Sequence, residues 1–218
     1  MSRVTKTRPL DGRFARLVAW FPPLAHVNPP NLVTSTSVAL AFWGLMLLST
    51  GRPEGALLCG LLTIPCDLVD GALARRLGLQ SSFGAALDSL ADAVSFCLLP
   101  AAVAHGVGLS AGFQQGLLLL YVLAGVWRLA HFEAAGLIQW RGRPAFVGVP
   151  TPYAASVLYL LACLALRVPG EPTRFLLTVG VLLLALAMVS GLPFRKGGWH
   201  YHVMWALLPL GAVVACWK

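Results

Sequence analysis

Long apolar segments follow one another along this chain, with only short polar stretches between them. A helix needs about 20 consecutive apolar residues to cross the hydrocarbon core of a bilayer. Because no water reaches the backbone there, such segments form helices, which satisfy their own polar groups. The expected spans cover residues 32–50, 56–77, 83–105, 111–135, 152–166 and 174–192, with the shorter run 203–217 as a further candidate.

The composition also indicates a membrane protein. Hydrophobic residues make up 58% of the chain and charged residues 11%, which leaves too little charge for the surface of a soluble domain. We therefore predict an all-α, polytopic helical membrane protein with six to seven transmembrane helices. An apolar run at residues 12–26 is broken by Arg13, Arg16 and two prolines. This predicts an N-terminal amphipathic helix on the membrane surface, not a signal peptide.

The chain is expected to divide into three parts. Residues 1–27 form a cytosolic tail with the surface helix, and residues 28–196 form one membrane domain. Residues 197–218 form a C-terminal apolar segment that is a candidate for an extra transmembrane helix.

The net charge of +8 points to an anionic lipid surface or a phosphate-bearing substrate, not to nucleic acid. Most basic residues fall on the same side of the membrane as the N-terminus, and the positive-inside rule makes this side cytosolic. The compact size and the absence of a targeting sequence favour a prokaryotic plasma membrane.

Four aspartates interrupt two of the apolar segments, and they are half of the eight acidic residues in the chain. Asp67 and Asp70 are three residues apart, and Asp88 and Asp92 are four apart, so each pair shares one face of a helix. Two antiparallel helices joined by a turn near Gly78 would bring all four carboxylates together. Their charges would repel inside a membrane unless cations neutralise them. Such hard oxygen ligands suit Mg²⁺ or Mn²⁺ and not zinc.

The aspartates belong to a longer pattern. It reads Asp-x-x-Asp-Gly-x-x-Ala-Arg, then eight residues, then Gly-x-x-x-Asp-x-x-x-Asp. This pattern resembles the signature of the CDP-alcohol phosphotransferases, which transfer a phosphatidyl or similar group from a CDP-linked donor to an alcohol and release CMP. Every fixed position is matched, by Asp67, Asp70, Gly71, Ala74, Arg75, Gly84, Asp88 and Asp92. The resemblance implies a membrane enzyme of phospholipid biosynthesis, which is expected to form a homodimer.

The resemblance also implies roles for these residues. Two divalent cations, Mg²⁺ or Mn²⁺, would be bound by Asp67, Asp70, Asp88 and Asp92. Asp92 would also be the general base that accepts the proton of the attacking hydroxyl. The glycines would let the nucleotide approach the backbone, and Arg75 would offer its planar fork to phosphate oxygens. The nucleotide and donor side would comprise Asn31, Thr34, Asp67, Gly71, Ala74, Arg75 and Gly84.

Further stretches are similar to the phosphatidylserine synthase branch of that family: residues 30–34, 128–132, 146–152 and 188–190. They favour CDP-diacylglycerol as donor and L-serine as acceptor. Two positions depart from the branch, with His131 in place of arginine and Glu133 in place of asparagine. A carboxylate there would favour an ammonium-bearing acceptor or repel the carboxylate of serine. The residues expected on the acceptor or phosphate side are Arg128, His131, Glu133, Arg141 and Arg143.

Other functions fit parts of the pattern. The acceptor could be glycerol 3-phosphate, an inositol phosphate or an amino alcohol, although a phosphorylated acceptor would need more basic residues than this chain offers. A cation transporter would also place carboxylates in a membrane. It would spread them through the membrane depth, however, and break matched helices. An inactive scaffold of the same fold is disfavoured because no fixed position is lost.

Overall fold

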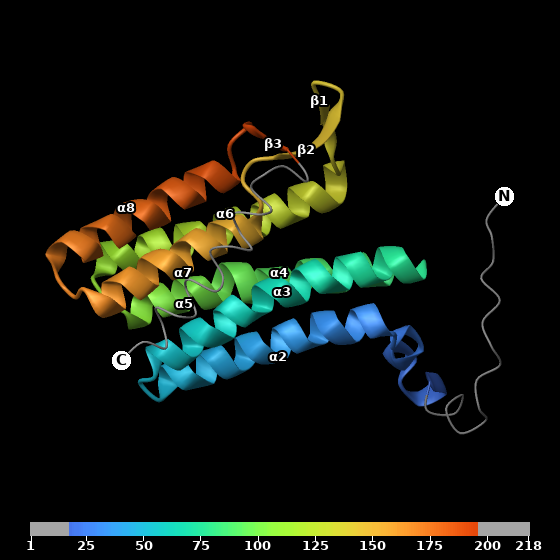
Figure 1. The fold of residues 1–218 in the computed structure, drawn as a ribbon, viewed down its shortest axis with the longest axis horizontal. Helices are drawn as coiled ribbons and strands as arrows, with labels where there is room; N and C mark the ends of the chain where they lie inside the picture. The colour runs from blue at the N-terminus through green and yellow to red at the C-terminus, as the bar shows by residue number, and fades with distance from the viewer. Residues whose placement is uncertain (1–17, 196–218) are drawn as a thin grey trace.

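The computed structural model describes residues 18–195, which form a bundle of long helices with a small sheet at one end (Figure 1). After the short helix η1 (Pro22–His26), the helical elements are α2 (Pro29–Ser49), α3 (Pro53–Leu77), α4 (Ser82–Asp92), η2 (Ala93–Leu98), α5 (Leu99–Gly106), α6 (Gly112–Ala135), α7 (Thr151–Arg167) and α8 (Glu171–Met188). The strands are β1 (Ile138–Trp140), β2 (Arg143–Val147) and β3 (Pro193–Arg195). The predicted helical membrane fold is confirmed.

Five of the described helical stretches are long and apolar enough to cross a membrane: α2, α3, the continuous stretch Ser82–Gly106, α6 and α8. The apolar helix α7 is shorter. These six stretches correspond to the six predicted segments, and the chain is an integral membrane protein. The candidate span at residues 203–217 and residues 12–17 of the predicted N-terminal surface helix lie outside the described residues. Of the rest of that run, Pro22–His26 form the short helix η1.

Local capping fixes the turn between α3 and α4. Gly78 caps the end of α3, and its φ of 65° is left-handed and therefore favours glycine. Ser81 caps the start of α4, where its side chain accepts a hydrogen bond from the Gly84 amide over 3.0 Å. In the same end of the bundle, the Asn28 side chain caps α2 by accepting from the Asn31 amide over 2.9 Å. The short turn brings the acidic ends of α3 and α4 next to the start of α2.

Small residues let the helices approach closely. A Cβ atom on Gly60 of α3 would lie 2.4 Å from the ring of Tyr159 on α7. A Cβ atom on Gly44 of α2 would lie 2.9 Å from Leu99 at the start of α5. Close packing at glycine is the usual means by which membrane helices associate. It explains why α3 and α7, which are distant in sequence, are neighbours.

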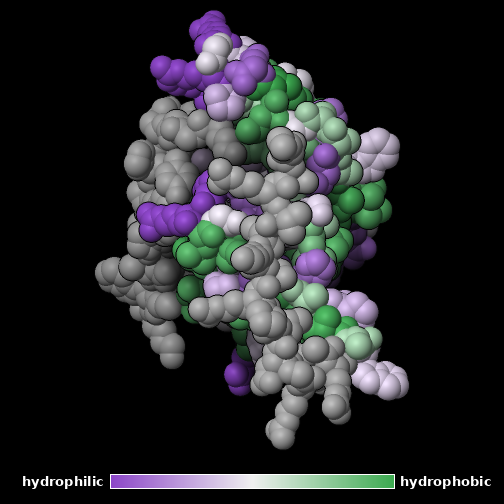
Figure 2. Space-filling view, turned by 90° about the vertical axis from the view of Figure 1, so that its right-hand side faces the viewer, coloured by the Kyte–Doolittle hydropathy of each residue, from purple (hydrophilic) through white to green (hydrophobic). Residues whose placement is uncertain are grey.

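The polar stretch after α6 contains the β1–β2 hairpin. β3, which follows α8, pairs antiparallel with β2, for example Phe194 with Phe146. The amide of Gly148 also donates to Leu192 O over 2.9 Å, and the amide of Val149 to Ala187 O over 3.1 Å. Seen from this end of the bundle, hydrophilic side chains gather over the hairpin (Figure 2). A pairing between segments so far apart leaves no local signal in the sequence.

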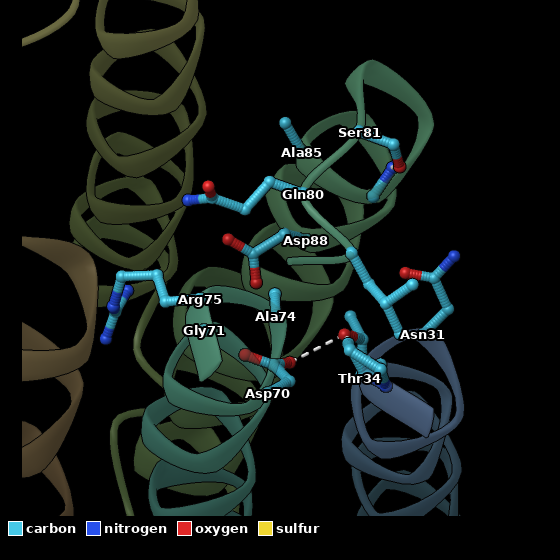
Figure 3. Close-up of a pocket in the computed structure, with 13 residues that line it drawn as sticks. Asn31, Thr34, Asp70, Gly71, Ala74, Arg75, Gln80, Ser81, Ala85 and Asp88 are labelled. Atoms are coloured by element: carbon cyan, nitrogen blue, oxygen red, sulfur yellow. Dashed lines mark hydrogen bonds between the residues drawn. The ribbon is translucent and has the colours of Figure 1, made fainter. Parts of the chain in front are cut away.

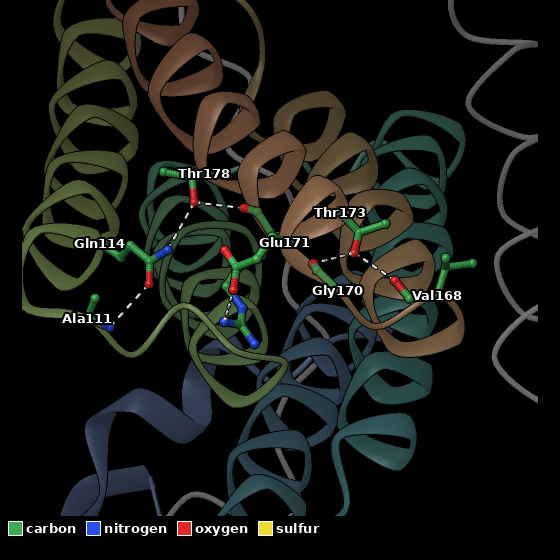
Figure 4. Close-up of polar contacts among 8 residues, drawn as sticks. Ala111, Gln114, Val168, Gly170, Glu171, Thr173 and Thr178 are labelled. Carbon is green, nitrogen blue, oxygen red and sulfur yellow. Dashed lines mark hydrogen bonds and ion pairs between the residues drawn. The ribbon is translucent and has the colours of Figure 1, made fainter.

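At the opposite end, polar side chains satisfy the starts of α6 and α8 (Figure 4). Gln114 accepts from the Ala111 amide over 3.1 Å and donates to Thr178 over 3.2 Å. Arg174 forms a 2.8 Å ion pair with Glu171, the one ion pair found in residues 18–195. These contacts stabilise the turns at that end of the bundle.

Candidate active site

Three carboxylates meet between α3 and α4. Asp67, Asp70 and Asp88 each offer one oxygen atom, and these atoms all lie within 4.8 Å of one another. Uncompensated charges at this spacing would be costly in apolar surroundings. Hard oxygen donors are also the ligands that Mg²⁺ and Mn²⁺ prefer. The donor set therefore fits a divalent cation, and we call these residues the aspartate trio.

A buried threonine orients one member of the trio. Thr34 on α2 donates to Oδ2 of Asp70 on α3 over 2.6 Å, and both side chains are buried (Figure 3). A hydrogen bond to a carboxylate is stronger than one between neutral groups and fixes its direction. α2 thus contributes to the trio without supplying a carboxylate.

Asp92 lies one helical turn beyond Asp88 on α4 and is only 9% exposed. Its carboxyl group lies beside that of Asp67 and within electrostatic reach of the Arg128 guanidinium. It is not one of the three close carboxylates. It therefore lies next to the trio and lines the same cavity as Arg128.

A cavity of about 210 Å³ opens beside the trio, between α2, α3 and the start of α4 (Figure 3). Of the residues predicted on the nucleotide side, all except Asp67 line it: Asn31, Thr34, Gly71, Ala74, Arg75 and Gly84. Arg75 is exposed and is the cation of this wall. The residues predicted for the nucleotide side therefore come from three helices and line one cavity.

A second cavity of about 430 Å³ lies on the other side of the trio. Asp70, Gly71, Arg75 and Asp88 line both cavities. Its volume is within the usual range for sites that hold small molecules. Two compartments thus meet at one acidic centre.

Arg128 of α6 points a buried charge into the larger cavity, which it lines while only 7% exposed. Its guanidinium carbon lies 5.5 Å from the ring centre of Phe132 and 5.4 Å from that of Phe146. Nη1 reaches Thr151 at 3.5 Å, but Nε has no hydrogen-bond partner among the described residues. A buried donor without a protein partner is available to a bound water molecule or to a ligand that accepts a hydrogen bond.

The small sheet covers this cavity. Phe146 of β2 and Phe194 and Arg195 of β3 line it. The sequence alone did not assign these side chains to the site. The stretch 146–152 was noticed for its resemblance, and its Phe146, Pro150 and Pro152 all line the cavity.

The predicted acceptor-side residues differ in where they lie. Arg128 lines the larger cavity, and Glu133 reaches its wall by accepting a 2.5 Å hydrogen bond from Ser89, a lining residue. His131 is exposed on α6, and neither it nor Arg141 or Arg143 lines either cavity. Arg141 stacks over Trp140 of the hairpin at 4.7 Å.

These features have a counterpart among known proteins. A sequence profile described as CDP-alcohol phosphatidyltransferase matches residues 27–213. The chain belongs to this family.

Several curated relatives from this family are named CDP-diacylglycerol–serine O-phosphatidyltransferase. The protein of Mycobacterium tuberculosis is 31% identical over 176 residues, which cover 77% of this chain and 60% of the relative. The protein of Helicobacter pylori is 29% identical, over 80% of this chain and 77% of the relative. The chain thus spans less than two thirds of the mycobacterial relative. The resemblance to the phosphatidylserine synthase branch is confirmed.

Solved structures of the phosphatidylinositol phosphate synthase of M. tuberculosis are also similar. The structure with CDP-diacylglycerol bound has 24% sequence identity and a TM-score of 0.49, over 81% of this chain and 86% of that chain. The structure in complex with manganese and citrate has the same identity and TM-score, over 88% of each chain.

The CDP-alcohol phosphatidyltransferase signature of this chain therefore lies at the junction of its two cavities. Several side chains that line the larger cavity are not fixed positions of that signature, among them Ser89, Arg128, Phe132 and Arg195. Arg128 could be found because it is a charge inside an apolar segment. Arg195 could not, because only the pairing of β3 with β2 carries it to the site.

Proposed function

We propose that the protein transfers the phosphatidyl group of CDP-diacylglycerol to L-serine, giving phosphatidylserine and CMP. The observation that carries this proposal is the aspartate trio at the junction of two cavities. A transferase needs such an arrangement, because donor and acceptor must meet at one point. Family membership and the names of the curated relatives support the donor and the acceptor.

The donor would place its cytidine and diphosphate in the smaller cavity. Asp67, Asp70 and Asp88 would hold one or two divalent cations, which when bound neutralise charge on the diphosphate. Arg75 would donate to phosphate oxygens from the wall of the cavity. The absence of a side chain at Gly71, which lines both cavities, leaves room for the diphosphate between them.

The acceptor would occupy the larger cavity. Its hydroxyl oxygen forms a bond to the phosphorus that carries the diacylglycerol, and the bond from that phosphorus to CMP breaks. Asp92 accepts the hydroxyl proton, since it lines this cavity beside the trio. Arg128 and Arg195, which line the same cavity, would bind the carboxylate of serine.

Other acceptors would keep this chemistry. A phosphorylated acceptor such as glycerol 3-phosphate or an inositol phosphate would need more positive charge than a carboxylate does. Arg75, Arg128 and Arg195 are the basic residues that line the larger cavity within the described chain. Their small number favours an unphosphorylated acceptor, and serine is preferred among these.

The active site would face the cytosol of a prokaryotic plasma membrane. Arg75, Arg76, Arg128, Arg141, Arg143 and Arg195 lie at the end of the bundle that holds the site, whereas Arg52, Arg167 and Arg174 lie at the other end. The positive-inside rule makes the first end cytosolic. CMP would then be released to the compartment that supplies the donor. A homodimer remains the expectation for the assembly.

The test is CMP release by the purified full-length protein with CDP-diacylglycerol and Mn²⁺ or Mg²⁺, across a panel of acceptors. We expect release with serine and its loss on addition of EDTA. Asp92→Asn should lower kcat by about 10²- to 10⁴-fold, the usual contribution of a general base, while Mn²⁺ still binds. Electron paramagnetic resonance of Mn²⁺ would measure the binding.

Each outcome decides one part of the proposal. Release with another alcohol and not with serine would overturn the acceptor and keep the reaction. Cation flux in proteoliposomes without CMP release from any acceptor would overturn the transferase and support a transporter.

A further inference from the structure

The helix that carries Asp92 changes its winding directly after this residue. Residues Ala93–Leu98 form the π-helical turn η2, and the backbone stays in the right-handed helical range on both sides. The amide of Leu99 donates to the carbonyl of Val94, five residues earlier, where an α-helix would use Ser95. Such turns are rare and are frequent at functional sites.

Two backbone carbonyls in this turn lose the donor that an α-helix would give them. The carbonyl of Ser95 loses the amide of Leu99. The carbonyl of Phe96 faces residue 100, which is a proline and has no amide hydrogen. The ring of Pro100 also crowds that carbonyl, which accounts for the widened turn. In a membrane interior, a carbonyl without a donor is costly.

Two tyrosines on other helices supply the missing donors. The hydroxyl of Tyr159 on α7 donates to the carbonyl of Ser95 over 3.1 Å. The hydroxyl of Tyr121 on α6 donates to the carbonyl of Phe96 over 3.0 Å. Both tyrosines have no exposed surface. The hydroxyl of Ser37 on α2 also lies 3.0 Å from that of Ser95, so three helices hold the turn.

The contact with α6 reaches the active site as well. Tyr121, Gly125 and Arg128 are four and three residues apart and share one face of α6. A Cβ atom on Gly125 would lie 2.4 Å from Sγ of Cys97 in η2. The face that holds the π-helical turn therefore continues to Arg128, which lines the larger cavity with Asp92.

We propose that Tyr121 and Tyr159 are positioning residues, which fix the direction of Asp92 by holding the π-helical turn in place. One extra residue in a turn rotates the following helix by about 100° relative to the preceding one. The turn thereby lets α4 aim Asp92 into the cavity while α5 buries Leu99 and Val103 in the core. This role rests on the proposed function, in which Asp92 accepts the acceptor's proton.

Tyr121→Phe and Tyr159→Phe test the role, because each keeps the ring and removes the hydroxyl. We expect kcat to fall about tenfold or more, since small displacements of a reacting group are costly. KM for CDP-diacylglycerol should stay within about twofold of the wild-type value and Mn²⁺ binding should persist, because the cation and the nucleotide are held by other residues. The control is Ser156→Ala, which also loses a buried hydroxyl that donates to a carbonyl, that of Pro152.

Pro100→Ala gives a second test, in which a loss of activity would not be explained by a less stable fold. The alanine amide can donate to the carbonyl of Phe96, so the helix should return to regular winding. We expect a higher unfolding temperature and a lower kcat, a combination that lost packing would not produce. Wild-type kcat in Pro100→Ala and in both tyrosine variants would overturn the positioning role. So would losses of kcat, Mn²⁺ binding and stability that match those of Ser156→Ala. If the wild-type protein releases no CMP, the proposed function fails, and the positioning role with it.

Discussion

At the scale of single residues, the four aspartates carry the same group in different surroundings. Asp70 is held by Thr34, whereas Asp92 lies beside Asp67 and near Arg128. The sequence predicted that the four would converge, because each pair shares one face of its helix and a short turn joins the two helices. Three of them form the close cluster, and Asp92 lies beside Asp67. The sequence could not show that Thr34 and Arg128 are neighbours of these carboxylates, because the two residues come from α2 and α6.

The Thr34 hydroxyl is predicted to strengthen cation binding. Thr34→Val keeps the shape of the side chain and removes the donor to Asp70, so that this carboxylate can turn away from the trio. We expect Mn²⁺ affinity to fall about tenfold, the equivalent of roughly 1.4 kcal/mol, as for the loss of one hydrogen bond to a charged group. Mn²⁺ titration followed by electron paramagnetic resonance would measure it.

The control is Thr36→Val, two residues along on α2 and therefore on a different face of the helix. Its hydroxyl donates to Leu32 O over 2.9 Å and is exposed. Equal affinities in the two variants would show that Thr34 does not act through Asp70.

Glu133 is predicted to select the acceptor. One carboxylate oxygen accepts from Ser89 at the cavity wall, and the other remains able to bind the ammonium group of serine. Glu133→Asn should therefore raise KM for serine by up to about tenfold with little change in kcat, because a charged hydrogen bond of the bound acceptor is lost. Steady-state kinetics with varied serine would measure it.

The sign of this change is informative. A lower KM in Glu133→Asn would mean that the carboxylate repels that of serine. Glu171→Asn, which alters an acid at the other end of the bundle, should leave both constants unchanged.

At the scale of elements, the junction between β2 and α8 decides whether the sheet covers the larger cavity. Gly148 has a φ of 72°, and a Cβ atom there would lie 2.2 Å from the carbonyl oxygen of Met188. The chain must stay close to this backbone for the amides of Gly148 and Val149 to reach Leu192 and Ala187. The sequence stretch resembled a known motif, but the contact exists only in the folded protein.

Gly148→Ala should lower the stability of the protein by more than the strain of a left-handed alanine alone would. A left-handed conformation costs a non-glycine residue about 1–2 kcal/mol, and the clash with Met188 adds to it. Gly142→Ala is the matched control, since Gly142 has the same φ of 72° and open space around it. Thermal unfolding in detergent should show the larger decrease for Gly148→Ala. Equal decreases would mean that the sheet shifts to relieve the clash with Met188 without a further loss of stability.

At the scale of the whole molecule, the distribution of arginines predicts the orientation in the membrane. The test uses cells that express the protein with its native cysteines replaced. In this background, Gln80→Cys, in the α3–α4 turn, should react with an impermeant maleimide only after the membrane is opened. Ser110→Cys, in the turn at the opposite end, should react in intact cells. Both positions are exposed. The reverse pattern would place the active site outside the cytosol.

The sequence by itself determined the helical membrane fold, the six described apolar helices and the convergence of Asp67, Asp70 and Asp88, with Asp92 beside them. These follow from length, hydropathy and spacing along one or two neighbouring helices, which act locally. The tertiary structure decided the π-helical turn after Asp92, held by Tyr121 and Tyr159, and the sheet that brings Arg195 to the cavity. Each of these depends on a hydrogen bond or pairing between segments far apart in the chain, and no local pattern records which partners will meet.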